Sequence, residues 1–159
     1  MVEFEKKIST RAELSVRMAA LPQPVVLTNG VFDILHRGHV TYLARAREEG
    51  ASLVVAVNTD ASIKRLGKGE DRPINNCADR MAVLAALEAV SLVVEFEEDT
   101  ALEIVQEGRP SVYAKGGDYQ IDVIPEGQAV LAYGGKVVAI AFEHDRSTSK
   151  LLSKVRQQS

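Results

Sequence analysis

The chain of 159 residues is long enough for one domain with a sizeable core, and 46% hydrophobic and 26% charged residues is the balance of an ordinary globular protein. Its net charge of −3 argues against non-specific nucleic-acid binding. A single cysteine, Cys77, excludes an intramolecular disulfide, and no segment is typical of a signal peptide or a membrane span, so we expect a cytoplasmic protein without nucleic-acid or membrane partners.

The first 24 residues predict a helical extension. Thr10 and Glu13 have the spacing of a capping box and open a short helix that ends before Pro22. This helix is weakly polar and could serve a homodimer contact. We therefore expect an N-terminal helical extension, 1–24, and a main domain, 25–159.

From residue 25 onward, short apolar runs alternate with helical patterns. Five runs are typical of buried strands, at 24–28, 52–58, 92–96, 111–115 and 136–142. Helices are predicted at 38–50, 60–66, 78–90, 100–108, from 123 to about 133, and 147–157. This alternation predicts an α/β fold: a Rossmann-like three-layer sandwich around a five-stranded, mainly parallel sheet.

Polar or glycine-rich segments follow four of the five strands. They read TNGVFD from residue 28, VNTD from 57, AKGGDY from 114 and FEHDRSTS from 142. Because ligands of such sheets bind beyond the carboxyl ends of the strands, these segments predict one shared site.

Two of the three histidines, His36 and His39, lie where the first strand of the main domain leads into a helix. Their spacing places both rings on one side of that helix, and Gly38 lets a ligand approach the backbone. A helix N-terminus favours an anion, so this turn predicts a phosphate site with two imidazoles directed into it. The alternative interpretation is one N-cap histidine and one core histidine. Zinc would need a third ligand from elsewhere, and a serine hydrolase would need a GxSxG segment that is absent.

The turn resembles a known motif. The residues HRGH at 36–39 match the HxGH motif of the cytidylyltransferase-like nucleotidyltransferases. The ordered set TNGVFDILHRGHVTYL, VAVNTDAS, DRPIN, DRMAVLAALEAV, FEEDT, KGGDY and FEHDRSTS is similar to one branch, the bacterial D-glycero-β-D-manno-heptose 1-phosphate adenylyltransferases, over about residues 25–156. In many bacteria this activity is fused behind a sugar kinase, and the sequence resembles the stand-alone version.

The resemblance implies a reaction between ATP and a sugar 1-phosphate. AMP would pass to D-glycero-β-D-manno-heptose 1-phosphate, giving ADP-heptose for lipopolysaccharide cores and pyrophosphate. The attacking phosphate is already an anion, so no general base is required, and catalysis would come from alignment and charge neutralisation. Mg²⁺ is expected to arrive with the polyphosphate, without a metal site built from the protein.

The resemblance also implies roles for individual residues. The catalytic set would be His36, His39, Lys64 and Arg80. The nucleotide would contact Thr28, Asn29, Gly30, Phe32, Gly38, Lys115, Gly116, Asp118, Ser147, Thr148 and Ser149. The sugar phosphate would contact Asp33, Asp60 and Arg65. Lys64 and Arg65 lead into a glycine-containing loop with Lys68 and Arg72, which we interpret as a flap that closes on the polyphosphate.

Two other functions remain open at this point. A cytidylyltransferase for a polyol phosphate would use the same mechanism, but Phe142 stands where glycerol-phosphate cytidylyltransferases carry an arginine, which favours the heptose branch. A non-catalytic nucleotide-binding module is the other alternative, and the intact histidines and serine-threonine segment argue against it. An aminoacylating enzyme would need an anticodon domain and a basic stripe.

Overall fold

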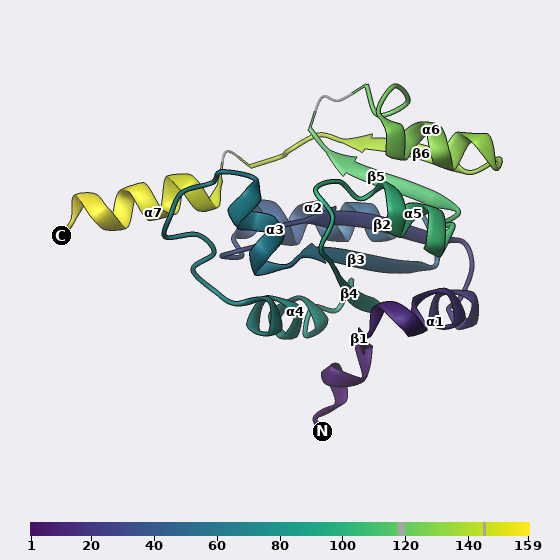
Figure 1. Ribbon diagram of the computed structural model, residues 1–159, viewed down its shortest axis with the longest axis horizontal. Helices are drawn as coiled ribbons and strands as arrows, with labels where there is room; N and C mark the ends of the chain where they lie inside the picture. Colours follow the sequence, from purple (N-terminus) through teal and green to yellow (C-terminus); the bar gives the residue numbers. More distant parts are fainter. Residues whose placement is uncertain (118–119, 145) are drawn as a thin grey trace.

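A six-stranded parallel sheet forms the centre of the protein in the computed structural model, which describes residues 1–117, 120–144 and 146–159. The strand order is β1-β4-β3-β2-β5-β6, and every neighbouring pair is parallel (Figure 1). The strands are β1 (Ile8–Ser9), β2 (Val25–Gly30), β3 (Ser52–Asn58), β4 (Leu92–Phe96), β5 (Val112–Gly116) and β6 (Lys136–Ile140). The α/β class and the parallel sheet are thereby confirmed.

The predicted number of strands was wrong, because the sheet has six strands and not five. The additional strand is β1, whose Ile8 pairs with Val93 and whose Ser9 pairs with Val94 of β4. Two residues are too few to produce an apolar run or an alternation in the sequence. This strand forms because the edge of β4 offers it backbone partners.

Helices cover both faces of the sheet. One face is covered by α1 (Leu14–Ala20), α5 (Leu102–Gly108) and α6 (Pro125–Ala132), and the other by α2 (Arg37–Glu48) and α4 (Cys77–Ala85). The short helix α3 (Asp60–Arg65) follows β3, and α7 (Thr148–Gln157) extends away from the body (Figure 1). Two 3-10 turns, Glu3–Lys7 and Arg11–Glu13, flank β1. None of the helices in the described ranges is long and apolar enough to cross a membrane.

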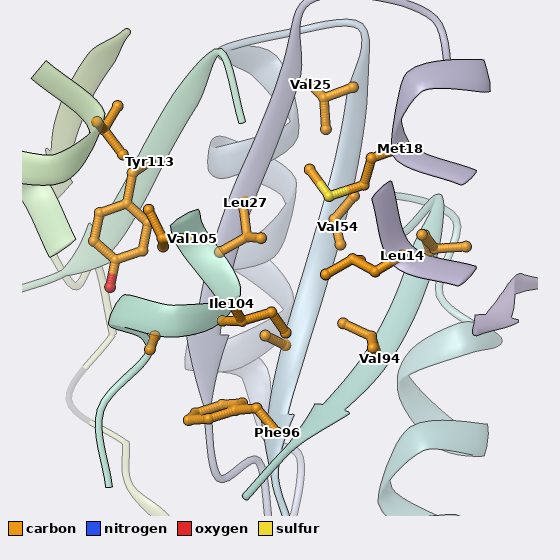
Figure 2. Packing of buried hydrophobic residues seen from close by; sticks show 14 of the residues in the cluster. Leu14, Met18, Val25, Leu27, Val54, Val94, Phe96, Ile104, Val105 and Tyr113 are labelled. Carbon is orange, nitrogen blue, oxygen red and sulfur yellow. The ribbon is translucent and has the colours of Figure 1, made fainter. Parts of the chain in front are cut away.

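Alternate residues of each central strand enter opposite cores. Val25 and Leu27 of β2 pack with α1 and α5, as Figure 2 shows, whereas Val26 packs with α2 on the other face. Both faces therefore exclude water, and this explains why the strands are continuous apolar runs.

The N-terminal segment is part of this core. Leu14 and Met18 of α1 are buried against the sheet and α5 (Figure 2). The segment 1–24 also supplies β1, so it is only partly helical. Val16 lies on the outer side of α1 and is 73% exposed. A dimer contact there, and the division of the chain at residue 24, stay predictions.

The order in which strands join the sheet reverses at β2. From β2 it continues to β3 and β4 on one side and returns to β5 and β6 on the other. At such a switch the loops after the strands diverge to opposite faces and leave a crevice at the carboxyl ends. The segments that follow β2, β4, β5 and β6 meet there.

We expect Leu14→Ala to lower the free energy of unfolding by about 2–5 kcal/mol, because it leaves a cavity between α1 and the sheet. Urea unfolding measures this change. Val16→Ala on the same helix is the matched control and should change stability by less than about 0.5 kcal/mol. Equal effects of the two substitutions would contradict the placement of α1 in the core.

Candidate active site

A cavity of about 1080 Å³ lies at the carboxyl end of the sheet. Its walls come from the turn between β2 and α2, the start of α5, the end of β5, the first turn of α6 and the segment that enters α7. A volume of this size can hold a nucleotide together with a second small substrate.

The two histidines are stacked at the start of α2. His36 is the N-cap residue, and its ring lies 3.8 Å from that of His39, with an angle of 23° between the ring planes. Phe32 contacts His39 edge-on at 5.3 Å. The Nδ1 atoms of both histidines are buried and have no hydrogen-bond partner in the described part of the chain. Neither residue therefore acts merely as a satisfied core or capping side chain.

Both imidazoles are poor bases in this environment. Burial and then the charge of Arg146 lower the pKa of His36. Burial and then the neighbouring His36 lower the pKa of His39 to about 4. At neutral pH the pair is uncharged, and each neutral imidazole can donate the N–H group of one ring nitrogen.

Gly38 makes the stacking possible. A Cβ atom at this position would lie 2.9 Å from Cε1 of His36 and 3.0 Å from its Nδ1. Any other residue would push the His36 ring away from His39. Gly38 itself does not line the cavity and acts through the ring beside it.

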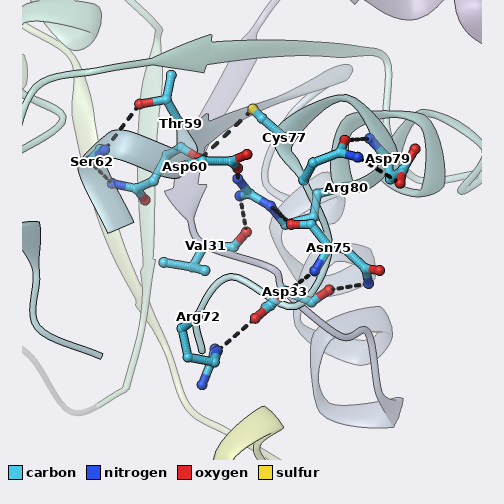
Figure 3. Close-up of polar contacts among 12 residues, drawn as sticks. Val31, Asp33, Thr59, Asp60, Ser62, Arg72, Asn75, Cys77, Asp79 and Arg80 are labelled. Atoms are coloured by element: carbon cyan, nitrogen blue, oxygen red, sulfur yellow. Dashed lines mark hydrogen bonds and ion pairs between the residues drawn. The ribbon is translucent and has the colours of Figure 1, made fainter. Parts of the chain in front are cut away.

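Asp33 is a buried anchor in the β2–α2 turn (Figure 3). Its carboxylate accepts hydrogen bonds from the backbone N–H of Ile74 and Asn75 at 2.8 and 2.9 Å and from Arg72 Nε at 2.6 Å. Burial alone would raise the pKa of this carboxyl, but the hydrogen bonds from Asn75, Ile74 and Arg72 outweigh it and lower the pKa. Asp33 thus ties the segment 67–76, which we call the flap, to the turn that carries the histidines.

Arg72 is the flap residue that this anchor fixes. It is 7% exposed and lines the cavity. The Nε of Arg72 donates to Asp33, and within the described ranges the two Nη groups of Arg72 donate to no acceptor. The flap carries a second cavity-lining cation, Lys68, and its Asp71 forms an ion pair with Arg156 of α7.

Arg80 of α4 is buried beneath the site. Its guanidinium donates to the backbone oxygens of Asn75 and Val31 at 2.9 and 2.8 Å and to Asp60 at 2.7 Å (Figure 3). These bonds hold the flap, the β2–α2 turn and the start of α3 together. Neither Arg80 nor Asp60 lines the cavity.

One hydroxyl ties the start of α7 to the cavity, and another caps the helix. Thr148 Oγ1 donates to the backbone oxygen of Ile34 at 3.0 Å, and Ser147 Oγ accepts the N–H of Lys150 at 3.0 Å. Ser149 lines the cavity beside them. The first turn of α7 therefore presents its free N–H groups and its positive dipole end to the site.

The end of β5 forms another wall. A Cβ at Gly116 would lie 2.8 Å from the ring of Phe142, so the glycine lets this ring approach the strand. Lys115 also lines the cavity. Behind this wall Thr28 and Tyr42 share a buried hydrogen bond between their hydroxyls. Asp118, for which the resemblance implied a contact with the nucleotide, lies outside the described residues.

The cavity brings together eleven of the residues singled out in the sequence: Asn29, Gly30, Phe32, Asp33, His36, His39, Lys115, Gly116, Ser147, Thr148 and Ser149. Six others do not line it: Thr28, Gly38, Asp60, Lys64, Arg65 and Arg80. Lys64 is exposed on α3, and Arg65 pairs with Asp99 at 2.9 Å. The functional roles of all these residues stay predictions.

Sequence reasoning did not single out several cavity residues, among them Tyr42, Asp99, Thr100 and Glu126. Tyr42 lies one turn beyond His39 and follows from helical spacing. Glu126 lies on α6, ten residues after the end of β5, where no strand-end pattern points to it.

The described side chains do not form a metal site. Across the described ranges, no three His, Cys, Asp or Glu side chains lie close enough together to hold a metal ion. Asp33, the buried carboxylate nearest to the histidines in sequence, is fully engaged by the flap.

Comparisons with known proteins agree with this geometry. A family model described as cytidylyltransferase-like matches residues 27–153. The chain belongs to the cytidylyltransferase-like family. This confirms the family resemblance that the HxGH motif indicated.

Relatives within the family share most of the chain. A D-beta-D-heptose 1-phosphate adenylyltransferase from Bordetella bronchiseptica is 58% identical over 97% of this chain and 96% of its own length. The bifunctional protein HldE from Shigella sonnei is 49% identical over 94% of this chain. The chain spans only 32% of that longer protein.

Solved structures share the fold. A lipopolysaccharide core biosynthesis protein from Thermoplasma volcanium is 29% identical, with a TM-score of 0.63 over 77% of this chain and 98% of its own. Pantothenate synthetase from Thermus thermophilus has a TM-score of 0.64 over 96% of this chain and 70% of its own, at 22% identity. The second likeness concerns the fold alone.

We expect Asp33→Asn to lower the free energy of unfolding by about 3 kcal/mol at pH 7, because the amide cannot accept all three hydrogen bonds and no longer neutralises the charge of Arg72. The folded pKa of Asp33 lies below the unfolded value of about 3.9. Its contribution is therefore complete above that value and is lost as the pH falls through the folded pKa. Urea midpoints at pH 7 and pH 3 measure the difference, which should shrink at pH 3.

The exposed Asp122, changed to Asn, is the control for this experiment and should leave the midpoint almost unchanged at both pH values. An Asp33→Asn effect of the same size at pH 7 and pH 3 would contradict the anchoring role of the carboxylate.

Proposed function

We propose that this protein transfers AMP from ATP to D-glycero-β-D-manno-heptose 1-phosphate, forming ADP-heptose and pyrophosphate. The observation that carries the proposal is the stacked, uncharged pair of His36 and His39 at the edge of a cavity large enough for both substrates. The 58% identical adenylyltransferase from Bordetella bronchiseptica supports this choice of substrates. Because ATP is the donor, we place the reaction in the cytoplasm.

The proposed reaction is a displacement at the α-phosphorus of ATP. An oxygen of the sugar's phosphate forms the new bond to this phosphorus, and the bond from phosphorus to the oxygen bridging the α- and β-phosphates breaks. The electron pair leaves with pyrophosphate. The attacking oxygen is already negatively charged, so the protein needs to align the groups and neutralise charge.

His36 and His39 would donate hydrogen bonds to the α-phosphate, where negative charge builds up during the displacement. The first turn of α7 would bind the β- and γ-phosphates through its N–H groups. Lys68 and Arg72 of the flap would add positive charge, and the Nη groups of Arg72 suit a bidentate contact with a phosphate. Arg80 would keep the flap and the turn in register.

Mg²⁺ would enter as the complex with ATP. The ion binds phosphate oxygens and water more readily than an all-protein cage, and the described residues offer no such cage. It would neutralise part of the charge on the polyphosphate.

A pyrophosphate-release assay tests the proposal. ATP or CTP is offered with the heptose 1-phosphate, with glycerol 3-phosphate or alone, in the presence of Mg²⁺. We expect release only with ATP and the heptose phosphate. His39→Ala should lower kcat/KM at least 100-fold, since it removes a donor to the charge that develops.

Arg37→Ala is the matched control, because Arg37 lies in the same helical turn, is exposed and does not line the cavity. It should retain activity within about threefold, and unfolding curves should show that both variants fold. Release with CTP and glycerol 3-phosphate would overturn the substrates and keep the mechanism. ATP binding with no release under any condition would indicate a binding module.

The affinity for ATP should rise as the pH falls from 8 to 6. The imidazoles of the free protein have lowered pKa values, and a bound polyphosphate raises them, so binding takes up protons. Calorimetry of MgATP binding at pH 7, in two buffers with different ionisation enthalpies, measures this uptake. The double variant with His36→Asn and His39→Asn should take up fewer protons, and an equal count in both proteins would contradict the role of the pair.

A further inference from the structure

One buried carboxylate in the cavity is not used by the mechanism above. Glu126, in the first turn of α6, is 7% exposed and lines the cavity. In the described part of the chain no donor forms a hydrogen bond with its carboxylate, and its oxygens are not among the buried side-chain atoms without a partner, so they are accessible from the cavity. A carboxylate in a cavity wall that no protein donor satisfies can accept hydrogen bonds from a ligand, so its presence favours a role toward a ligand.

The backbone around Glu126 fixes its position. Pro125 begins α6, and a Cβ at Gly127 would lie 1.8 Å from the backbone oxygen of Ile121. Glycine at 127 therefore lets the preceding loop pack directly on the first turn of the helix. The carboxylate is held at the positive end of α6, which favours a negative charge there.

A hydrogen-bond donor with a defined orientation lies in the same region. The Tyr113 hydroxyl donates to Asn29 Oδ1 at 2.6 Å, so the Nδ2 group of this amide remains for the cavity that Asn29 lines. Burial first, and then the charge of Glu126, raises the pKa of Tyr113, so the carboxylate is within electrostatic reach of that hydroxyl. An acceptor and a donor thus face the cavity from α6 and β2.

This pair of groups suits sugar hydroxyls. Each hydroxyl can donate to a carboxylate and accept from an amide, whereas the negative charge of Glu126 repels phosphate. Asp99 and Thr100, from the segment between β4 and α5, line the same cavity and add further polar groups.

The direction of the displacement indicates which substrate lies there. Attacking and leaving oxygens stand on opposite sides of the α-phosphorus. Pyrophosphate would leave toward the first turn of α7, which extends beyond the end of the sheet, whereas α6 lies beside β5 and β6 (Figure 1). The acceptor would therefore approach from the side of α5 and α6.

We propose that Glu126, together with the Asn29 amide, binds hydroxyl groups of the acceptor's sugar and thereby selects a polyhydroxylated sugar phosphate. This inference rests on the proposed function, because it names the part of the acceptor that the site recognises. Glu126 is a specificity-determining residue that does not touch the reacting phosphates.

Glu126→Gln tests the inference, because it keeps the shape of the side chain and removes its charge. The KM for heptose 1-phosphate should rise about 10- to 100-fold, while the KM for ATP stays within about twofold and kcat changes little. The thermal midpoint of the ligand-free variant should stay about the same, since no protein hydrogen bond to the carboxylate is lost.

Glu143→Gln is the matched control. Glu143 also lines the cavity, but its carboxylate pairs with Arg45 at 2.8 Å and is half-exposed. This variant should leave the KM for both substrates within about twofold of the wild-type values.

Three outcomes would overturn the inference. A raised KM for ATP alone would assign Glu126 to the ribose of the nucleotide. A lowered thermal midpoint with unchanged KM values would indicate a structural role. Unchanged KM values and an unchanged midpoint would remove any role toward the sugar.

Calorimetric binding of heptose 1-phosphate separates this inference from the proposed function. Turnover in the wild type without any effect of Glu126→Gln overturns the inference alone. Binding without pyrophosphate release in the wild type contradicts the proposed function, and the effect of Glu126→Gln on affinity then decides the inference by itself. Absence of binding overturns both.

Discussion

The pairing of β2 with β3 on one side and β5 on the other is the constraint on which the site depends. This pairing uses the backbone groups on both edges of the strand, and helices cover both of its faces. The carboxyl end of β2 is therefore held in place, and it lies where the strand order reverses. The stacked His36 and His39, which begin the next helix, take their positions from that point.

A second level of order comes from buried charges. Asp33 binds the flap through two backbone N–H groups and Arg72, and Arg80 binds the flap, the turn and Asp60 from below. A charge removed from water is stable only when hydrogen bonds surround it, so each of these groups determines the path of several loops. The flap is consequently a defined wall of the cavity, although its glycines and charges are typical of a surface loop.

Sequence and structure agree where one pattern has one physical meaning. Continuous apolar runs predicted the buried parallel strands, and the spacing of His36 and His39 predicted that they lie together. The two-residue β1 was missed because an edge of β4, and no pattern of its own, makes it a strand. The resemblance implied a catalytic role for Lys64 and Arg80 beside the histidines. Lys64 is exposed on α3 and Arg80 is buried below the cavity, and their catalytic roles stay predictions.

The sequence by itself determined the α/β class, the strand-to-helix turn with its histidines, and the family to which the chain belongs. These properties are carried by local periodicity and by motifs of adjacent residues. Only the tertiary structure decided the sixth strand, the partners of Asp33 and Arg80, and the place of Glu126 in the cavity. Each of these depends on segments far apart in the chain, and burial and hydrogen bonding act between such segments only after they have packed together.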